Sequence, residues 1–226
     1  MKKLRNAIIL FLTFGLIIAN TISINYSFAD VSKPEKVTEV RVSKRDCNSV
    51  KLEWCKVKNA SGYRVYRSTA KNGIYKVVNV VPNNTPCFVA KDLQSGTDYY
   101  FMVRAYKIVN GKTCLGYCSD WVETTTCPEA VKSVYASGVT DSCAQIAWKK
   151  VCRASGYEVY RSTCVNKNYK RVATITDGNK SCYKDTNLKR NEKYYYKIRA
   201  FKESNGQVCF GCFSDILCIF TKKNWY

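Results

Sequence analysis

The chain contains short segments in which hydrophobic and polar residues alternate, and these segments occur twice in the same order. The clearest of them is SGYRVYRST at residues 61–69, and SGYEVYRST at residues 155–163 repeats eight of its nine positions after a shift of 94. In the first copy Tyr63, Val65 and Arg67 would face one side of a strand. A period of two is typical of a β-strand with one buried face. The repeat therefore predicts two domains that fold in the same way.

Similar alternation predicts seven short strands in each repeat, with the segment above as the third. Around it we expect strands at residues 37–43, 50–54, 75–81, 87–89, 99–106 and 121–126, and in the second repeat at 131–137, 144–148, 169–175, 182–184, 194–201 and 216–221. The second strands each place a tryptophan, Trp54 or Trp148, at an alternate and hence buried position.

The ends of the repeats define the expected domains. Pro34 and Pro128, again 94 residues apart, open the two units, since proline suits the entry of an edge strand. We therefore predict domains at residues 34–127 and 128–222, with a short lead at 30–33 and a tail at 223–226.

The first 29 residues resemble a targeting segment. Lys2, Lys3 and Arg5 precede an apolar run at residues 7–19, and Ser27-Phe28-Ala29 has the small-x-small pattern of a cleavage site. The run is shorter than the ~20 residues that span a bilayer. We expect a secretory signal peptide at residues 1–29 and no transmembrane segment in the mature chain. An uncleaved membrane anchor is the alternative.

Three features together resemble the fibronectin type III domain: the tryptophan on the second strand, the Gly-Tyr-x-Val-Tyr third strand, and a Leu-x5-Tyr corner before the sixth. The resemblance implies an all-β fold with two seven-stranded immunoglobulin-like sandwiches in tandem. It also implies tyrosine corners at Tyr99 with Leu93 and at Tyr194 with Leu188. The second repeat has Asn191 where the first has Gly96, which leaves the geometry of that turn open. The tyrosine-rich and lysine-rich style is similar to the bacterial secreted form of the family.

Composition narrows the classes of function. The sequence contains no histidine, which removes the commonest general base and the commonest metal ligand. No pair of carboxylates stands out as an acid and base couple. We therefore expect a protein that is not an enzyme and needs no cofactor.

The chain is strongly basic, with a formal net charge of +20. Loss of the leader would remove three basic residues and no acidic one, which leaves +17. Such a surface attracts polyanions, for example an anionic cell-wall polymer, and export makes nucleic acid an unsuitable partner. The alternative is a lysine-rich surface that serves only solubility.

The thirteen cysteines are unusual for this family, and in an exported protein they favour disulfides. The implied topology places one quartet of cysteines at one loop end of each sandwich. The quartets are Cys55, Cys87, Cys114 and Cys118 in the first repeat and Cys152, Cys182, Cys209 and Cys212 in the second. We expect two bridges within each quartet and, at the opposite ends, the bridges Cys47 with Cys127 and Cys143 with Cys218. Cys164 is left over as a free thiol that could form a covalent dimer.

Two other readings of the cysteines compete with disulfides. Each quartet could hold zinc through four thiolates, because Cys114 with Cys118 and Cys209 with Cys212 have suitable spacing. The pair Cys209 and Cys212 also matches a redox C-x-x-C pattern, but that chemistry uses a helix N-terminus, and no helix is predicted there.

The candidate binding faces follow from the alternation. If the odd-numbered residues of the third strand face the core, the outward positions of the third and sixth strands carry Tyr66, Tyr100, Arg104 and Tyr106, and in the second repeat Tyr160, Tyr195, Arg199 and Phe201. Rings between cations could stack on sugars or contact a partner protein. The alternative is that they are cross-strand pairs that only stabilise the sheet.

The sequence thus predicts a secreted or surface-associated binding and adhesion module. Its partner would be a protein or polysaccharide at a cell surface or in a matrix. A carbohydrate-binding accessory protein of a polysaccharide-degrading system and a small cationic envelope-binding effector are the alternatives.

Overall fold

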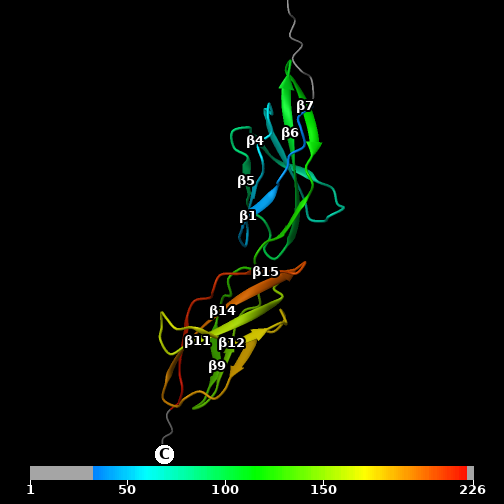
Figure 1. Ribbon diagram of the computed structural model, residues 1–226. Coiled ribbons are helices and arrows are strands. Elements are labelled where there is room, and N and C mark those ends of the chain that lie inside the picture. The colour runs from blue at the N-terminus through cyan, green and yellow to red at the C-terminus, as the bar shows by residue number, and fades with distance from the viewer. Residues whose placement is uncertain (1–32, 223–226) are drawn as a thin grey trace, which may run out of the picture. The chain divides into compact units, whose positions relative to one another are not determined.

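The computed structural model describes residues 33–222, and every regular element in this part is a strand (Figure 1). The predicted signal peptide and the tail at residues 223–226 lie outside the described residues. Within residues 33–222 there is no helix long and apolar enough to cross a membrane. The strands form two sandwiches, one for each sequence repeat.

The first sandwich packs a three-stranded sheet against a larger one. The small sheet has the order β1-β2-β5, with β1 (Arg41–Arg45), β2 (Val50–Glu53) and β5 (Cys87–Ala90). The large sheet has the order β4-β3-β6-β7, with β4 (Lys76–Pro82), β3 (Gly62–Ser68), β6 (Asp98–Val109) and β7 (Lys112–Cys118), and β8 (Val122–Thr125) also pairs with β6.

The second sandwich has the same topology. Its small sheet has the order β13-β10-β9, with β13 (Cys182–Asp185), β10 (Ala144–Ala147) and β9 (Tyr135–Val139). Its large sheet has the order β12-β11-β14-β15, with β12 (Lys170–Ile175), β11 (Gly156–Ser162), β14 (Lys193–Ser204) and β15 (Gln207–Phe210), and β16 (Leu217–Phe220) also pairs with β14. The all-β tandem of sandwiches predicted from the sequence is confirmed.

The alternation along β3 and β6 separates core from surface as expected. Tyr63, Val65 and Val103 are fully buried, and Trp54 packs edge-on against Tyr63 with ring centroids 5.3 Å apart. Trp148 and Tyr157 are also 5.3 Å apart in the second sandwich. Burial of large side chains at alternate positions is therefore what joins the two sheets of each sandwich.

The first strand of each sandwich begins later than the sequence suggested. We expected strands from residues 37 and 131, but β1 begins at Arg41 and β9 at Tyr135. Glu39 and Ser133, which are 94 residues apart, both have φ of 54°, in the left-handed region. A strand cannot pass through that conformation, so the ladder begins only after it.

The predicted seventh strands at residues 121–126 and 216–221 correspond to β8 and β16. Each follows a further strand, β7 or β15, where the sequence predicted a loop, and a break separates the two strands. In the first sandwich the break is at Ser119, whose N–H donates to Val103 O at 2.9 Å while its Oγ accepts from Val103 N at 2.9 Å. Ser214 makes the matching bonds with Ile198. The serine side chain thus replaces one ladder bond and lets the strand change direction.

The two tyrosine corners are present. The Tyr99 hydroxyl accepts a hydrogen bond from Gln94 N at 2.9 Å, and the Tyr194 hydroxyl accepts one from Lys189 N at 2.8 Å. Asn191 has φ of 53°, close to the 58° of Gly96. The second turn therefore keeps the geometry of the first, because asparagine tolerates the left-handed region.

We predict that Tyr194→Phe lowers the free energy of unfolding by about 1 kcal/mol, because the Lys189 N–H loses its acceptor at a half-buried corner. Denaturant unfolding would measure the change. Tyr135→Phe is the matched control, since Tyr135 is 55% exposed and should change stability little. An equal loss in both variants would contradict a structural role for the corner.

Candidate functional site: the outer faces of the large sheets

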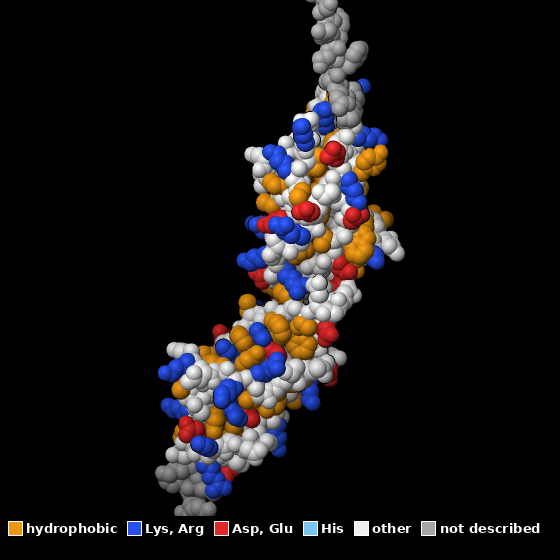
Figure 2. All heavy atoms as spheres, viewed as in Figure 1, with side chains coloured by type: hydrophobic (Ala, Val, Ile, Leu, Met, Phe, Trp, Pro, Cys, Tyr) orange, Lys and Arg blue, Asp and Glu red, His pale blue; other side chains and the backbone are white. Residues whose placement is uncertain are grey.

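The outer faces of the large sheets carry the side chains that the sequence singled out. Seven of the eight predicted residues are half-buried there: Tyr66, Tyr100, Arg104, Tyr106, Tyr160, Tyr195 and Arg199. Central strands hold them, because β3 lies between β4 and β6, and β11 lies between β12 and β14. In the second sandwich, hydrophobic and cationic side chains are interleaved on the face that Figure 2 shows.

Phe201 corrects the prediction for the eighth residue. It is only 7% exposed, with its ring beside Phe210 at a centroid distance of 6.2 Å. The ring also covers Gly156, where an added Cβ would lie 2.6 Å from Phe201 Cζ. Phe201 therefore fills the space left by the missing side chain of the glycine and offers little surface to a partner. An added Cβ at Gly156 would also clash with Ile175 O, so the ring and the neighbouring backbone together explain the glycine of the Ser-Gly-Tyr sequence.

Glu158 is the centre of the outer face of the second sandwich. Its side chain is 3% exposed and accepts hydrogen bonds from Tyr160 Oη at 3.0 Å, from Arg199 Nε at 2.8 Å and from Arg171. Burial opposes its ionisation, but the bonds from Arg171 and Arg199 outweigh burial, so the pKa of Glu158 lies below its ordinary value. The carboxylate is thus the internal counter-ion of two arginines.

Aromatic rings surround the cations of this face. The Arg199 guanidinium lies 4.0 Å from the centroid of Phe210, and the Lys197 ammonium lies 4.2 Å from Phe213 and 4.3 Å from Tyr169. These distances suit cation–π attraction. Together with Glu158, the rings hold the cations of the second sandwich in fixed positions.

The sequence prediction missed Glu158, although a signal for it was present. Position 158 is the one at which the two nine-residue copies differ, because Arg64 occupies the matching position in the first repeat. A buried charge at an otherwise repeated position indicates a role specific to one domain.

The first sandwich arranges its face differently. Arg104 Nε donates to Gly116 O at 2.6 Å. The Tyr100 hydroxyl donates to Glu123 at 2.7 Å, and this bond raises the pKa of Tyr100 to about 12. Trp121 packs edge-on against Tyr100 at 5.8 Å and carries Lys71 over its ring at 4.4 Å. This face therefore exposes aromatic rings and cations in alternation.

Comparison with known proteins supports the fold. No protein-family model matches the chain, and no curated protein matches its sequence. Among solved structures, a two-domain fibronectin type III segment of chicken tenascin is similar over 85% of this chain and 100% of its own length, with a TM-score of 0.50 and 19% identity. The FN1–FN3 domains of chicken CNTN1 match over 84% of this chain and 67% of their own length, with a TM-score of 0.40 and 20% identity.

The chain has a tandem fibronectin type III-like fold. Within the repeated nine-residue segment, its two type III-like sandwiches differ in one charge, because Glu158 occupies the position of Arg64.

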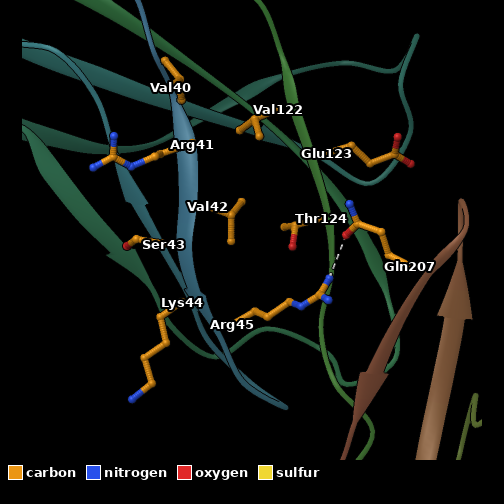
Figure 3. Close-up of a pocket in the computed structure, with 10 residues that line it drawn as sticks. All are labelled: Val40, Arg41, Val42, Ser43, Lys44, Arg45, Val122, Glu123, Thr124 and Gln207. Atoms are coloured by element: carbon orange, nitrogen blue, oxygen red, sulfur yellow. Dashed lines mark hydrogen bonds between the residues drawn. The ribbon is translucent and has the colours of Figure 1, made fainter.

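An open groove lies at the edge of the first type III-like sandwich, where β1 and β8 are not hydrogen-bonded to each other (Figure 3). Figure 3 shows Val42 and Thr124 pointing into the groove, while Arg41 and Lys44 point away from it. Arg45 reaches along the groove to Gln207, to which its Nη1 donates a hydrogen bond at 3.1 Å. This groove is the open edge between the two sheets of the sandwich.

The disulfide of the structure joins Cys127 to Cys209. The predicted bridge of Cys47 with Cys127 is therefore wrong. The prediction of two bridges within the quartet of the second sandwich is also wrong, because Cys209 is bonded to a cysteine outside that quartet. Cys127 ends the first repeat but also precedes Pro128, whose carbonyl packs against Gly211 near Cys209. The backbone of Cys127 is hydrogen-bonded to Asp46 and Gly96 of the first sandwich, but its sulfur is bonded to Cys209 of the second, a pairing that is missed when each cysteine is placed within one sandwich.

The other eleven cysteines are unpaired in the structure, including Cys143 and Cys218, which were predicted to pair. Cys164 lies in the turn after β11, with its N–H bonded to Ser162 Oγ at 2.9 Å, and its use in a dimer stays a prediction. Among residues 33–222, no group of three or more His, Cys, Asp or Glu side chains could hold a metal ion. Cys209 is bonded to Cys127 rather than to Cys212, which leaves no C-x-x-C redox pair.

We predict that Glu158→Gln lowers the free energy of unfolding at neutral pH by about 3 kcal/mol, because the change leaves Arg199 and Arg171 without a charged partner. The folded-state pKa of Glu158 is depressed, so its stabilisation is present above the ordinary value of 4.5 and is lost as pH falls through the folded-state pKa. Denaturant unfolding between neutral and acidic pH should show the two proteins converging in acid. Glu35→Gln, at an exposed position, is the control, and a pH-independent difference would contradict the assignment.

We predict that reduction of the Cys127–Cys209 disulfide lowers the thermal stability of the type III-like tandem. The bridge joins residues 82 apart, and closing a loop of that length stabilises a fold by about 4 kcal/mol. Differential scanning calorimetry with and without reductant measures the effect, and peptide mapping identifies the bridge. Cys209→Ser should unfold at the lower temperature and respond little to reductant, whereas a full response in that variant would assign the effect to other cysteines.

Proposed function

We propose that this protein is an exported, non-catalytic binding and adhesion module that acts at a cell surface or in a matrix. The observation that carries the proposal is the repeated outer face, where tyrosines and arginines stand side by side on the central strands of each large sheet. Arginine and aromatic residues are the types most enriched at contact surfaces. Two such faces on one chain provide two places at which a partner can be held.

The way the faces are built supports a binding role. Their side chains project from strands that are paired on both sides, so little conformational freedom is lost when a partner binds. Fibronectin type III-like domains in tandem typically serve as binding modules, which agrees with this reading. The net charge of +17 expected after removal of the leader would draw the protein to anionic surfaces.

Export rests on the leader and on the cysteines. A signal peptide at residues 1–29 would take the chain to an oxidising compartment, where a bridge such as Cys127–Cys209 is maintained. The partner we propose is a protein or polysaccharide at the cell surface, with anionic wall polymers included. Pairing of Cys164 between two copies would double the number of faces and raise avidity.

The test is a pull-down of the oxidised mature chain on purified cell wall, insoluble polysaccharides and matrix proteins, at low and at high salt. We expect retention on one of these surfaces that persists at high salt, because stacking and hydrogen bonding on a fixed face are screened less than long-range charge attraction. Tyr66→Ala combined with Tyr160→Ala should reduce this retention. Tyr135→Ala, at an exposed position on β9, is the control for loss of a tyrosine. Binding to every anionic surface that disappears with salt would contradict a specific face.

A further inference from the structure

The internal repeat allows one outer face to be compared with the other at matching positions. In the second sandwich, Glu158 of β11 lies directly opposite Arg199 of β14. In the first sandwich, Arg64 of β3 lies directly opposite Arg104 of β6. A pair of opposite charges has thus become a pair of like charges at the same place in the sheet. Like charges directly opposite each other destabilise a sheet.

Nothing in the neighbouring positions compensates the arginine pair. In the row across the sheet, Val80 lies beside Arg64 and Cys118 beside Arg104. Within residues 33–222, the Arg64 side chain makes no hydrogen bond or ion pair, and Arg104 donates only to a backbone carbonyl, that of Gly116. Neither guanidinium group therefore has a carboxylate partner in the described part of the chain.

Tyr66, which lies beside the two arginines, also lacks the acceptor that its counterpart Tyr160 has. In the second sandwich the Tyr160 hydroxyl donates to Glu158, together with Arg199. Its counterpart Tyr66 has no hydrogen-bond partner among the described residues. The first sandwich thus keeps two of the three donors that surround the carboxylate in the second, Tyr66 and Arg104. It has Val77 at the position of Arg171, and it adds Arg64 where the carboxylate itself would be.

We propose that Arg64, Arg104 and Tyr66 bind a carboxylate group of an acidic polysaccharide. This carboxylate would occupy the place that the Glu158 carboxylate has in the second sandwich. The two guanidinium groups would donate charge-assisted hydrogen bonds to the carboxylate, and the Tyr66 hydroxyl would donate a further one. Binding would relieve the repulsion between the arginines. The proposal rests on the proposed function, since it names the chemistry that one of the two faces recognises.

The position of the cluster favours a polysaccharide over a peptide strand. An extended peptide is usually held by the unpaired backbone groups of a sheet edge. Arg64 and Arg104 lie on β3 and β6, each of which has hydrogen-bonded neighbours on both sides. A sugar chain needs no ladder bonds and can present a carboxylate to a flat face. The tyrosines around the cluster offer ring faces on which sugar rings can lie.

The probe for the test is an oligogalacturonate, and its fully methyl-esterified form is the matched neutral ligand. Calorimetric titration of the oxidised mature chain should give binding of the acid form and at least tenfold weaker binding of the ester, as expected for loss of charge-assisted bonds worth about 1.5 kcal/mol or more. Arg64→Glu should lose binding of the acid form by a similar factor. This variant should also melt at a higher temperature than the wild type without ligand, because it rebuilds the Glu158–Arg199 pair in the first sandwich.

Two further variants separate a specific site from general charge attraction. Lys91→Glu changes the net charge by the same amount at an exposed position after β5, and it should retain binding of the oligogalacturonate. Arg64→Gln removes one cation without adding a carboxylate, so it should weaken binding even if the charge reversal disturbs folding. Equal losses in Lys91→Glu and Arg64→Glu would overturn the proposal, as would tighter binding of a sulfated dextran or a poly-glutamate peptide than of the oligogalacturonate.

The failure of this inference is distinguishable from failure of the proposed function. If Arg64→Glu keeps its salt-resistant retention in the pull-down, and melts at or below the wild-type temperature, the carboxylate site is wrong while the binding module stands. If the wild type binds no surface but Arg64→Glu is stabilised, the like-charge pair is real and the adhesion role is wrong. Absence of both oligogalacturonate binding and the stabilisation would reject the site itself.

Discussion

The pairing of β3 with β6, and of β11 with β14, is the constraint on which the rest of the structure depends. These central strands bury every second side chain against the small sheet and fix the other side chains in rows on the outer face. The rows explain why Tyr63 and Tyr157 are fully buried while Tyr66 and Tyr160 remain available to solvent. A residue on the outer face is therefore positioned by the core beneath it and needs no loop to present it.

Because the strand pairing is the same in both sandwiches, the difference between Arg64 and Glu158 determines the charge balance of each outer face. With Glu158 in place, the second sandwich compensates Arg199 and Arg171 internally and gathers rings around its cations. With Arg64 in that place, the first sandwich has two opposed cations and no acid beside them. In the second sandwich the residue at this position stabilises the domain. In the first sandwich the residue at the same position leaves a local repulsion that an external anion can relieve. A stability cost at a surface position is typical of functional sites.

Much of the fold could be predicted from the sequence, because a period of two, a repeated tryptophan and a tyrosine corner depend on local patterns. The failures have physical reasons. Phe201 alternates as a surface residue but packs over Gly156, a contact that only the register of β11 with β14 determines. Cys127 is held by backbone bonds to the first sandwich while its sulfur is bonded to Cys209 of the second, and no pattern within one repeat predicts a bridge between repeats. The Glu158 cluster depends on Arg171, which a register shift in the pairing of β12 with β11 sets opposite Tyr160. No sequence period encodes such a shift.

The central claim is that the first outer face is an uncompensated anion site and the second is closed by its own carboxylate. Arginine Nε–Hε resonances measured by NMR during titration with an oligogalacturonate test this claim most directly. The account predicts shifts for Arg64 and Arg104 that saturate together, with Arg199 and Arg171 unchanged. Uniform shifts of all four arginines, or shifts confined to Arg199, would contradict it.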